Sequence, residues 1–596
     1  MDAFDSDVLV YAAAPNHPLG ARVLSLFVAA VERNELAGIG SVLLIPELLA
    51  KPMREDSHQE MAALGVLLAR LDLRPTDAHT ARLATALSAN YRLRAADAVH
   101  LATAVNAGAT RFLTNNSRDF PMSISEIDVV YPAEGHVMTA HDSTFLFGSV
   151  GNGDALLSIN GAPVRVNPNG SFMAFLPVPA DTTYALQATL PGGERAQAVR
   201  RIRFPARLTG PRPPPAQIDT VGFPKFATLA NTNFDATSDT DMVTVVRPTP
   251  GGTYKWFLLP GTAVQATGTL NGSVRIRLDS QLEAWVEPGG ARFTDDTGVR
   301  RRTISAGRVV NGSGFTDVIF PMSARAPYMV DQSGDRLTLT IYDAVSNIDL
   351  IRYDTRDPSV RVVRWEQVAT DRVRLDVELR HPSVGYLVMW RAGALVLRVR
   401  HVPVVDASAP LRGRVIAVDP GHPPIGATGP TRLREPEATL AVAQWVKQFL
   451  EERGATVVML RTTMDAVALG ARPIEARRAN AEAFVSVHMN AFADGANPYA
   501  AARGSGTFFF HPQSEPLARA VQEGLVQHMG LRDEGVFFNN LAVARPTWFP
   551  SVLCEGAFLV MPEQEAALRT PEFQKAYAMG IVDGLEVYFR ALSAKP

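Results

Sequence analysis

The spacing of apolar and polar residues divides the chain into an alternating first part, a β-rich middle and an alternating last part. Near the start, the short apolar run 8–11 predicts a strand, and 111–114 predicts another. Between them, apolar positions recur at helical spacing in four stretches, at 21–31, 59–71, 78–89 and 96–107. Strands that alternate with helices predict an α/β domain over residues 1–130.

The middle of the chain consists of short alternating runs separated by turn pairs such as Asn160-Gly161 and Asn271-Gly272. This pattern is typical of β-sandwiches and small barrels. A proline-rich stretch at 210–215 interrupts it and is typical of a linker. We therefore predict an Ig-like β module (136–206), a Pro-rich linker (207–219), an SH3-like barrel (220–298) and a further β-rich module (299–405).

The last part, residues 412–596, returns to alternating strands and helices. Continuous apolar runs of the kind found in buried strands occur at 415–418, 456–460, 484–487 and 551–553. Helical spacing occurs at 435–453, 475–483, 515–529 and 571–592. The alternation predicts an α/β domain with a mostly parallel sheet and helices on both faces.

Composition limits the kinds of partner and site. The formal net charge of −2 provides no basic field that would attract nucleic acid or an anionic membrane to the whole chain. Cys554 is the one cysteine, so a metal site must rely on His, Asp or Glu. No apolar stretch reaches transmembrane length, and no Lys or Arg precedes the first apolar run. We therefore expect no membrane span, and the first residues do not have the pattern of a secretory signal peptide.

Metal-binding and acidic side chains follow the predicted strands of the last domain. His422, His488 and Glu555 each come just after a strand, and Glu435 opens the first helix. Ligands of open α/β sheets bind outside the carboxyl ends of the strands, so we expect these groups to share one crevice. Each residue alone fits a packed histidine, a turn or a helix-dipole partner. Together they favour a catalytic zinc site, in which two imidazoles and one carboxylate leave a position for water.

Four segments resemble, in order, the motifs of the N-acetylmuramoyl-L-alanine amidases, which are zinc-dependent enzymes that cut peptidoglycan. The segments are Val418–His422, Leu433–Glu435, Ser486–Ala491 and Val552–Leu559. The resemblance covers nearly all of residues 413–593 and implies that the bond cut joins the lactyl group of N-acetylmuramic acid to L-Ala of the stem peptide.

The resemblance also assigns roles to individual side chains. It implies that His422, Glu435 and His488 bind Zn²⁺ and that Glu555 is the catalytic acid and base. It places Arg545 near the substrate.

Residues 1–121 resemble a PIN domain, the fold of many toxin-type ribonucleases, in segments Phe4–Tyr11, Pro46–Leu49, Ala96–Ala102 and Phe112–Phe120. The resemblance implies that Asp5, Glu47, Asp97 and Asn116, with Asp119 nearby, form a site for Mg²⁺ or Mn²⁺. Residues 1–120 contain 11 Lys or Arg against 13 Asp or Glu, which provides no basic stripe for RNA. An active nuclease and a purely structural PIN fold both stay open.

The β-rich middle has no convergent catalytic set. Trp256, Trp285 and Trp390 have two interpretations, the lining of a glycan or peptide groove and the filling of a core, and core filling is favoured for most of them. The Ig-like and SH3-like modules are similar to those that bind wall polymer or act as spacers before wall hydrolases.

We therefore predict a modular zinc amidase whose partner is peptidoglycan and whose location is the periplasm or cell wall, although no export signal is visible in the sequence. One alternative is a PIN-type ribonuclease with a passenger C-terminus, in which case nucleic acid is a partner. Another is a non-enzymatic wall-binding protein. The joining of PIN and amidase segments is itself expected to reflect a gene fusion or an erroneous gene boundary.

Overall fold

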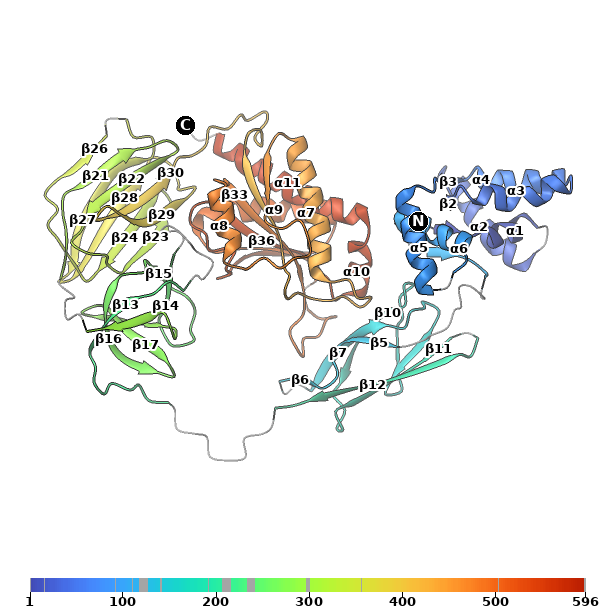
Figure 1. The fold of residues 1–596 in the computed structure, drawn as a ribbon, viewed down its shortest axis with the longest axis horizontal. Helices are drawn as coiled ribbons and strands as arrows, with labels where there is room; N and C mark the ends of the chain where they lie inside the picture. The colour runs from blue at the N-terminus through green and yellow to red at the C-terminus, as the bar shows by residue number, and fades with distance from the viewer. Residues whose placement is uncertain are drawn as a thin grey trace. The chain divides into compact units, whose positions relative to one another are not determined.

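The computed structural model of the protein describes residues 2–14, 17–91, 93–109, 111–116, 127–139, 142–190, 192–205, 216–232, 242–295, 301–354, 356–501 and 503–593. The chain forms two compact units, one of residues 1–126 with 188–196 and one of 127–187 with 197–596. Figure 1 labels many of their helices and strands. Within the described ranges, no helix has the length and apolarity that a membrane crossing requires.

The first unit contains a four-stranded sheet in the order β3-β2-β1-β4, with every pairing parallel. Its strands are β1 (Asp2–Phe4), β2 (Gly38–Ser41), β3 (Leu71–Arg74) and β4 (Arg111–Leu113). Its helices are α1 (Ser6–Ala13), α2 (Pro18–Glu32), α3 (Leu44–Arg54), α4 (His58–Leu68), α5 (Ala78–Tyr91) and α6 (Ala95–Asn106). The α/β class predicted for this domain is what the structure contains.

The strand predicted at 8–11 is wrong, because these residues lie in α1. The first strand is the three-residue β1, and Asp5 follows it as the N-cap of α1, accepting a hydrogen bond from the backbone N–H of Ser6. Val8 and Leu9 of the apolar run are buried on one side of that helix. Because Asp5 caps the start of a helix, the short apolar run that follows it is helical and does not form a β-strand.

Residues 128–203 contain a module of eight strands in two sheets, ordered β10-β7-β5 and β6-β12-β11-β8-β9. They are β5 (Asp128–Tyr131), β6 (His136–Val137), β7 (Ser143–Ser149), β8 (Leu156–Ile159), β9 (Ala162–Val164), β10 (Ser171–Pro177), β11 (Thr183–Thr189) and β12 (Arg195–Arg203). Because β5 pairs with β7, the domain boundary predicted at residue 130 falls inside a strand of this module. Most of the linker predicted at 207–219 lies outside the described residues.

The next β-rich stretch contains a seven-stranded sheet in the order β15-β14-β18-β17-β16-β13-β19. Its strands are β13 (Lys225–Leu229), β14 (Thr244–Arg247), β15 (Trp256–Leu258), β16 (Ala263–Leu270), β17 (Ser273–Asp279), β18 (Leu282–Val286) and β19 (Ala291–Thr294). The turn pair Asn271-Gly272 joins β16 to β17 with both residues at positive φ, 51° and 83°, as a two-residue hairpin requires.

The third β module has a five-stranded sheet, β26-β21-β22-β30-β29, a four-stranded sheet, β23-β24-β28-β27, and the pair β20-β25. Its strands are β20 (Arg302–Ile304), β21 (Gly307–Asn311), β22 (Phe315–Pro321), β23 (Tyr328–Ser333), β24 (Arg336–Tyr342), β25 (Ala344–Ser346), β26 (Ile351–Tyr353), β27 (Val360–Ala369), β28 (Arg372–Leu379), β29 (Tyr386–Arg391) and β30 (Ala394–Arg400).

The β13–β19 and β20–β30 modules share one hydrophobic core, which extends from Ala227 to Val399. Buried Arg302 joins them, because its guanidinium donates to the carbonyl of Ala263 and pairs with Asp343. Trp256 and Trp285 are buried, as core filling requires. The two modules therefore pack as one body, while their SH3-like and β-rich assignments stay predictions.

The last domain has a six-stranded sheet in the order β32-β31-β33-β36-β34-β35, in which only the β34–β36 pairing is antiparallel. Its strands are β31 (Val415–Pro420), β32 (Thr456–Met459), β33 (Ala483–Asn490), β34 (Ser505–Phe509), β35 (Asp533–Phe538) and β36 (Ser551–Phe558). Its helices are α7 (Glu435–Glu452), α8 (Ala471–Arg478), the 3₁₀ turn η1 (Pro512–Ser514), α9 (Glu515–Met529), α10 (Pro562–Leu568) and α11 (Pro571–Ser593).

Helices cover both faces of this sheet, as predicted. Residues of α7, α9 and α11 pack in one apolar cluster with β31, β33 and β36, and a second cluster contains Ala476 of α8 with Phe484 and Phe549. The helix predicted at 475–483 is wrong at its end, because α8 stops at Arg478 and β33 already begins at Ala483.

Candidate functional site

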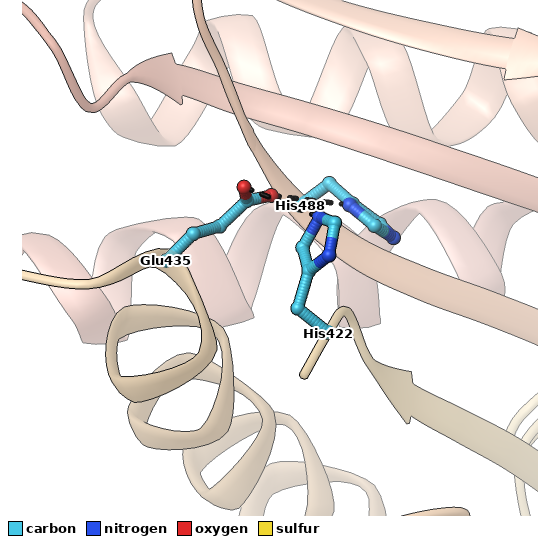
Figure 2. A group of neighbouring side chains, drawn as sticks. All are labelled: His422, Glu435 and His488. Atoms are coloured by element: carbon cyan, nitrogen blue, oxygen red, sulfur yellow. Dashed lines mark hydrogen bonds and ion pairs between the residues drawn. The ribbon is translucent and has the colours of Figure 1, made fainter. Parts of the chain in front are cut away.

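Three side chains of types that can bind a metal ion, His422, Glu435 and His488, converge in the last domain (Figure 2). His422 Nε2 lies 3.2 Å from Glu435 Oε2, and His488 Nδ1 lies 3.1 Å from Glu435 Oε1. One ligand atom from each residue lies within 4.8 Å of the other two, and no other group of three among the described residues meets this condition. Ligands about 2.1 Å from a tetrahedral zinc ion are roughly 3.4 Å apart, so these three residues fit such an ion.

The backbone brings the three residues together from distant parts of the sequence. His422 follows β31 and has φ of 57°, which turns the chain sharply where the strand ends. Glu435 is the first residue of α7, and His488 lies near the end of β33, next to β31 in the sheet. The three side chains share one crevice, as expected, but the prediction that His488 follows its strand is wrong, because β33 continues to Asn490.

Glu435 is held as a buried carboxylate at the centre of the group. It is 3% exposed, and its oxygens accept hydrogen bonds from the backbone N–H of Ala427 (2.8 Å) and of Met489 (3.0 Å). Burial alone would raise its pKa, but His422 and His488 lower the pKa to about 2. The two imidazoles therefore favour the ionised carboxylate, which is the form that can bind a metal ion.

A buried ion pair supports the segment that carries His422. The Arg472 guanidinium on α8 binds Asp419 Oδ1 (2.6 Å) and donates to the carbonyl oxygens of Pro420 (2.9 Å) and His422 (3.1 Å). Ser486 Oγ donates to the other Asp419 oxygen at 2.6 Å. The carbonyls on both sides of the turn are thereby fixed to α8, which is how residues outside a ligand set orient it.

Arg461, just after β32, holds the same turn from another side. It donates to the carbonyl oxygens of Gly421 (3.1 Å) and Pro436 (2.9 Å), and Thr439 Oγ1 also donates to Gly421 (2.8 Å). Arg461 thus connects the His422 turn with the first turn of α7, which begins with Glu435.

Two positions next to this group of side chains leave no room for any residue larger than glycine. A Cβ on Gly421 would lie 2.5 Å from Cε1 of His488, and a Cβ on Gly426 would lie 3.1 Å from Cγ of His422. The imidazole rings therefore occupy the space that any larger residue would need at these positions.

Glu555 lies beside the three-residue group but is not one of its members. In the parallel β33–β36 pairing it is opposite His488, and its Oε2 is buried with no hydrogen-bond partner in the described part of the chain. Burial, and then the charge of Glu435, raise its pKa well above the ordinary value. The prediction that Glu555 follows its strand is wrong, because β36 continues to Phe558.

The first unit brings its predicted acidic residues into one neighbourhood. Asp5 accepts a hydrogen bond from Thr114 Oγ1 (2.7 Å), and Asn116 Nδ2 donates to Asp97 (3.4 Å). Glu47 binds His100 Nε2 at 2.9 Å, which lowers the pKa of Glu47 despite its burial. Their oxygens are not gathered as closely as the ligand atoms of the second unit, and Asp119 lies outside the described residues.

Asp7 belongs to this acidic group, although it is not among the residues predicted for the site. Burial, then the charge of Asp5 and, less strongly, that of Asp97 raise the pKa of Asp7. The signal in the sequence was the Asp5-Ser6-Asp7 triplet, which places two carboxylates at the start of one helix.

Comparison with known families identifies both ends of the chain. Residues 416–587 match the N-acetylmuramoyl-L-alanine amidases, and residues 3–121 match the PIN domain. The chain belongs to the N-acetylmuramoyl-L-alanine amidase family. That membership resides in the last domain, called the amidase domain from here on, and the first unit contains a PIN domain.

Relatives and solved structures match the amidase domain. The uncharacterized protein YqiI of Bacillus subtilis is 32% identical over 209 residues, which cover 34% of this chain and 98% of YqiI. The probable cell wall amidase LytH of Staphylococcus aureus is 32% identical over 191 residues, which cover 30% of this chain and 60% of LytH. A solved N-acetylmuramoyl-L-alanine amidase from Clostridium difficile 630 is 29% identical, covers 30% of this chain and 97% of that chain, and has a TM-score of 0.28.

Arg545 of the amidase domain makes its described contacts away from the three-residue group. Its guanidinium carbon lies 4.6 Å from the centre of the Tyr254 ring and 5.8 Å from that of Phe257, both in the β13–β19 module. Its carbonyl accepts a hydrogen bond from His511 Nε2 at 2.8 Å. The substrate-binding role assigned to Arg545 stays a prediction.

Proposed function

We propose that the amidase domain hydrolyses the amide between N-acetylmuramic acid and L-Ala of peptidoglycan with a zinc ion held by His422, Glu435 and His488. The observation that carries this proposal is the convergence of two imidazoles and one ionised carboxylate beside a second carboxyl that is no part of the group. Two imidazoles with one carboxylate are a ligand set of catalytic zinc, which keeps a further position open.

A bound zinc ion supplies Lewis acidity, which polarises an amide carbonyl and makes water a stronger nucleophile. Glu555 supplies the proton transfers. Its carboxylate accepts a proton from the attacking water as the new C–O bond forms, and the carboxyl then donates that proton to the amine nitrogen as the C–N bond breaks. Burial raises the pKa of this carboxyl, which favours the protonated form that donates in the second step.

The other residues of the site hold its geometry. Arg461 and Arg472 fix the backbone on both sides of His422, so the imidazole does not have to be ordered when metal or substrate binds. LytH is named as a probable cell wall amidase. This similarity supports our proposal that the activity lies in the cell wall or the periplasm and that peptidoglycan is the partner.

Glu555→Gln in the full chain tests the proposal, because it keeps the shape of the side chain and removes its basicity. We expect the variant to retain about one zinc per chain by elemental analysis and to lose roughly 10²–10⁴ in the rate of stem-peptide release from purified wall. Glu523→Gln, on the exposed side of α9, is the matched control. A Glu555→Gln chain as active as the parent would overturn the role of Glu555, and a parent without zinc or activity would overturn the function itself.

A second candidate function is a metal-dependent nuclease in the PIN domain. The observation in its favour is the grouping of acidic residues: Asp5 and Asp7 begin one helix, and Asn116 bonds to Asp97 at 3.4 Å. The charges of Asp5 and Asp97 raise the pKa of Asp7, and a divalent cation would offset this negative charge. We expect Mg²⁺- or Mn²⁺-dependent cleavage of RNA by the parent and at least about a 100-fold loss in Asp5→Asn. RNA cleavage that is insensitive to both the cation and the Asp5→Asn substitution would exclude this site.

A further inference from the structure

A cavity of about 1030 Å³ lies between the amidase domain and the two β modules that share a core. Neither the three-residue metal group nor Glu555 contributes to its lining. Its walls include Tyr254 from the β13–β19 module and Tyr386 from the β20–β30 module. Pockets of roughly 300–1,000 Å³ hold small molecules, so this cavity has the size of a binding site.

The structure holds the three walls together by direct contacts. Asn540 Nδ2 donates to the carbonyl of Tyr254 (3.1 Å), and the backbone N–H of Tyr386 donates to the carbonyl of Thr547 (2.7 Å). Gly385 lies so close to Trp548 that an added Cβ would be 2.0 Å from the Trp548 carbonyl oxygen. The cavity is thus part of a packed junction.

Aromatic rings and positive charges face this cavity. Arg545 and Arg247 both stack on the Tyr254 ring, with guanidinium carbons 4.6 and 4.4 Å from its centre. Arg247 has a carboxylate partner in Glu287 at 2.9 Å. Arg545 has none among the described residues, and its Nε is buried without an acceptor. Burial first, and then the charge of Arg247, lower the pKa of Arg545.

The charged side chains in the lining indicate which sign of charge a ligand would carry. Lys255, Arg477 and Arg545 contribute positive charge, and Asp331 is the one carboxylate among the described residues of the lining. Arg545 is half-buried and its Nε is shielded from water, so holding this guanidinium without a counter-ion costs free energy that an anionic ligand would offset. A guanidinium binds a carboxylate through two parallel N–H donors, and the aromatic walls suit the apolar part of a peptide.

We propose that this cavity is a second binding site, which takes a short peptide through a carboxylate bound to Arg545. The assignment of the peptide to the substrate polymer rests on the proposed function, because stem peptides are then the peptides that the chain meets. A second site would hold peptidoglycan by its peptide while the amidase domain works on a neighbouring amide, and two linked sites bind a polymer more tightly than either does alone.

Calorimetric titration of the full-length Glu555→Gln chain tests the site without turnover. The probe is a synthetic tripeptide that begins with L-Ala and ends in a free carboxylate, and its partner probe is the same tripeptide with a C-terminal amide. We expect the acid to bind at least about tenfold more tightly than the amide. Arg545→Gln should remove that preference, whereas Arg519→Gln, an exposed pair with Glu515 on α9, should preserve it.

Equal binding of the acid and the amide, or no binding at millimolar concentration, would overturn the proposal, as would tighter binding of a neutral disaccharide. This comparison needs only the two probes, so it holds even if Arg545→Gln does not fold. Failure of the proposed function would be seen separately, as a parent chain that binds the acid but contains no zinc and releases no stem peptide.

Discussion

Replacing Arg472 with Met should destabilise the amidase domain strongly, because it removes one half of a buried ion pair. The side chains of Arg472 and Asp419 are 4% and 1% exposed, and their closest N–O distance is 2.6 Å. Met keeps much of the length and apolar contact of the arginine but donates no hydrogen bond. Asp419 would then be left with the Ser486 hydroxyl at 2.6 Å as its remaining side-chain donor.

The expected loss is about 3–5 kcal/mol in the free energy of unfolding, which is the usual cost of leaving one charge of a buried pair without its partner. Adding Asp419→Asn removes that charge, so the double variant should recover most of the loss. It should not recover metal affinity. The donor to the His422 carbonyl is still missing, and losses of this kind weaken metal binding by roughly 10–100-fold.

Hydrogen exchange of the full chain in denaturant can report on this domain alone, through peptides from β31 and α8, whereas a global melting curve would mix several domains. Arg478→Met is the matched control, because Arg478 lies on the same helix and forms an exposed pair with Glu475 at 2.8 Å. Such surface pairs contribute about 0–1 kcal/mol. An Arg472→Met loss no larger than that of Arg478→Met would refute the reasoning.

Three further predictions concern the pH dependence of stability, the steric requirement at Gly421 and the requirement for a metal ion. Burial lowers the pKa of His511 from 6.5 to about 4, so acidification across that range protonates the unfolded amidase domain first. The free energy of unfolding of this domain should therefore fall by about 3 kcal/mol, measured by hydrogen exchange of its peptides in denaturant at both ends of the range. Gly421→Ala should weaken zinc binding by at least about tenfold in chelator competition, because its Cβ would displace the His488 ring. Removal of metal by a chelator should abolish stem-peptide release, and added Zn²⁺ should restore it.

Each of these has its own control. His511→Gln keeps an amide donor for the Arg545 carbonyl and should flatten the pH dependence of stability; an unchanged slope would show that another group titrates. Gly65→Ala adds a methyl group where nothing lies within 4 Å, and equal effects of the two glycine substitutions would rule out a steric cause. Full activity after exhaustive chelation would contradict a metal requirement.

Regular, long amphipathic segments were predictable from the sequence, and short ones were not. The bounds of α9 equal the predicted 515–529, because an apolar stripe ends at Gly530, which has φ of 65°. The run 8–11 has no apolar stripe of helical length and no terminating glycine. It is helical because Asp5 caps the first turn of α1. In β33 and β36 the polar side chains of His488 and Glu555 interrupt the apolar pattern, although the backbone pairing continues past them.

The three candidate metal ligands could be selected from the sequence because residue type and nearness to an apolar run or a helix start are local features. The contacts that hold them were not, since Arg461 and Arg472 reach the His422 turn from sites about 40 and 50 residues away. The shared core of the two β modules could not be predicted either. The alternation of apolar and polar residues shows which face of a strand is buried, but not which sheet packs against that face.

The two candidate metal sites differ in a way that allows them to be studied separately in one chain. In the amidase domain a carboxylate lies between two imidazoles, and nitrogen ligands favour zinc. In the PIN domain the selected groups are carboxylates and an amide, and oxygen ligands favour Mg²⁺ or Mn²⁺. A zinc-selective chelator should therefore stop stem-peptide release and spare any RNA cleavage. Loss of both activities together would mean that the two units depend on one metal, which their separate ligand sets do not predict.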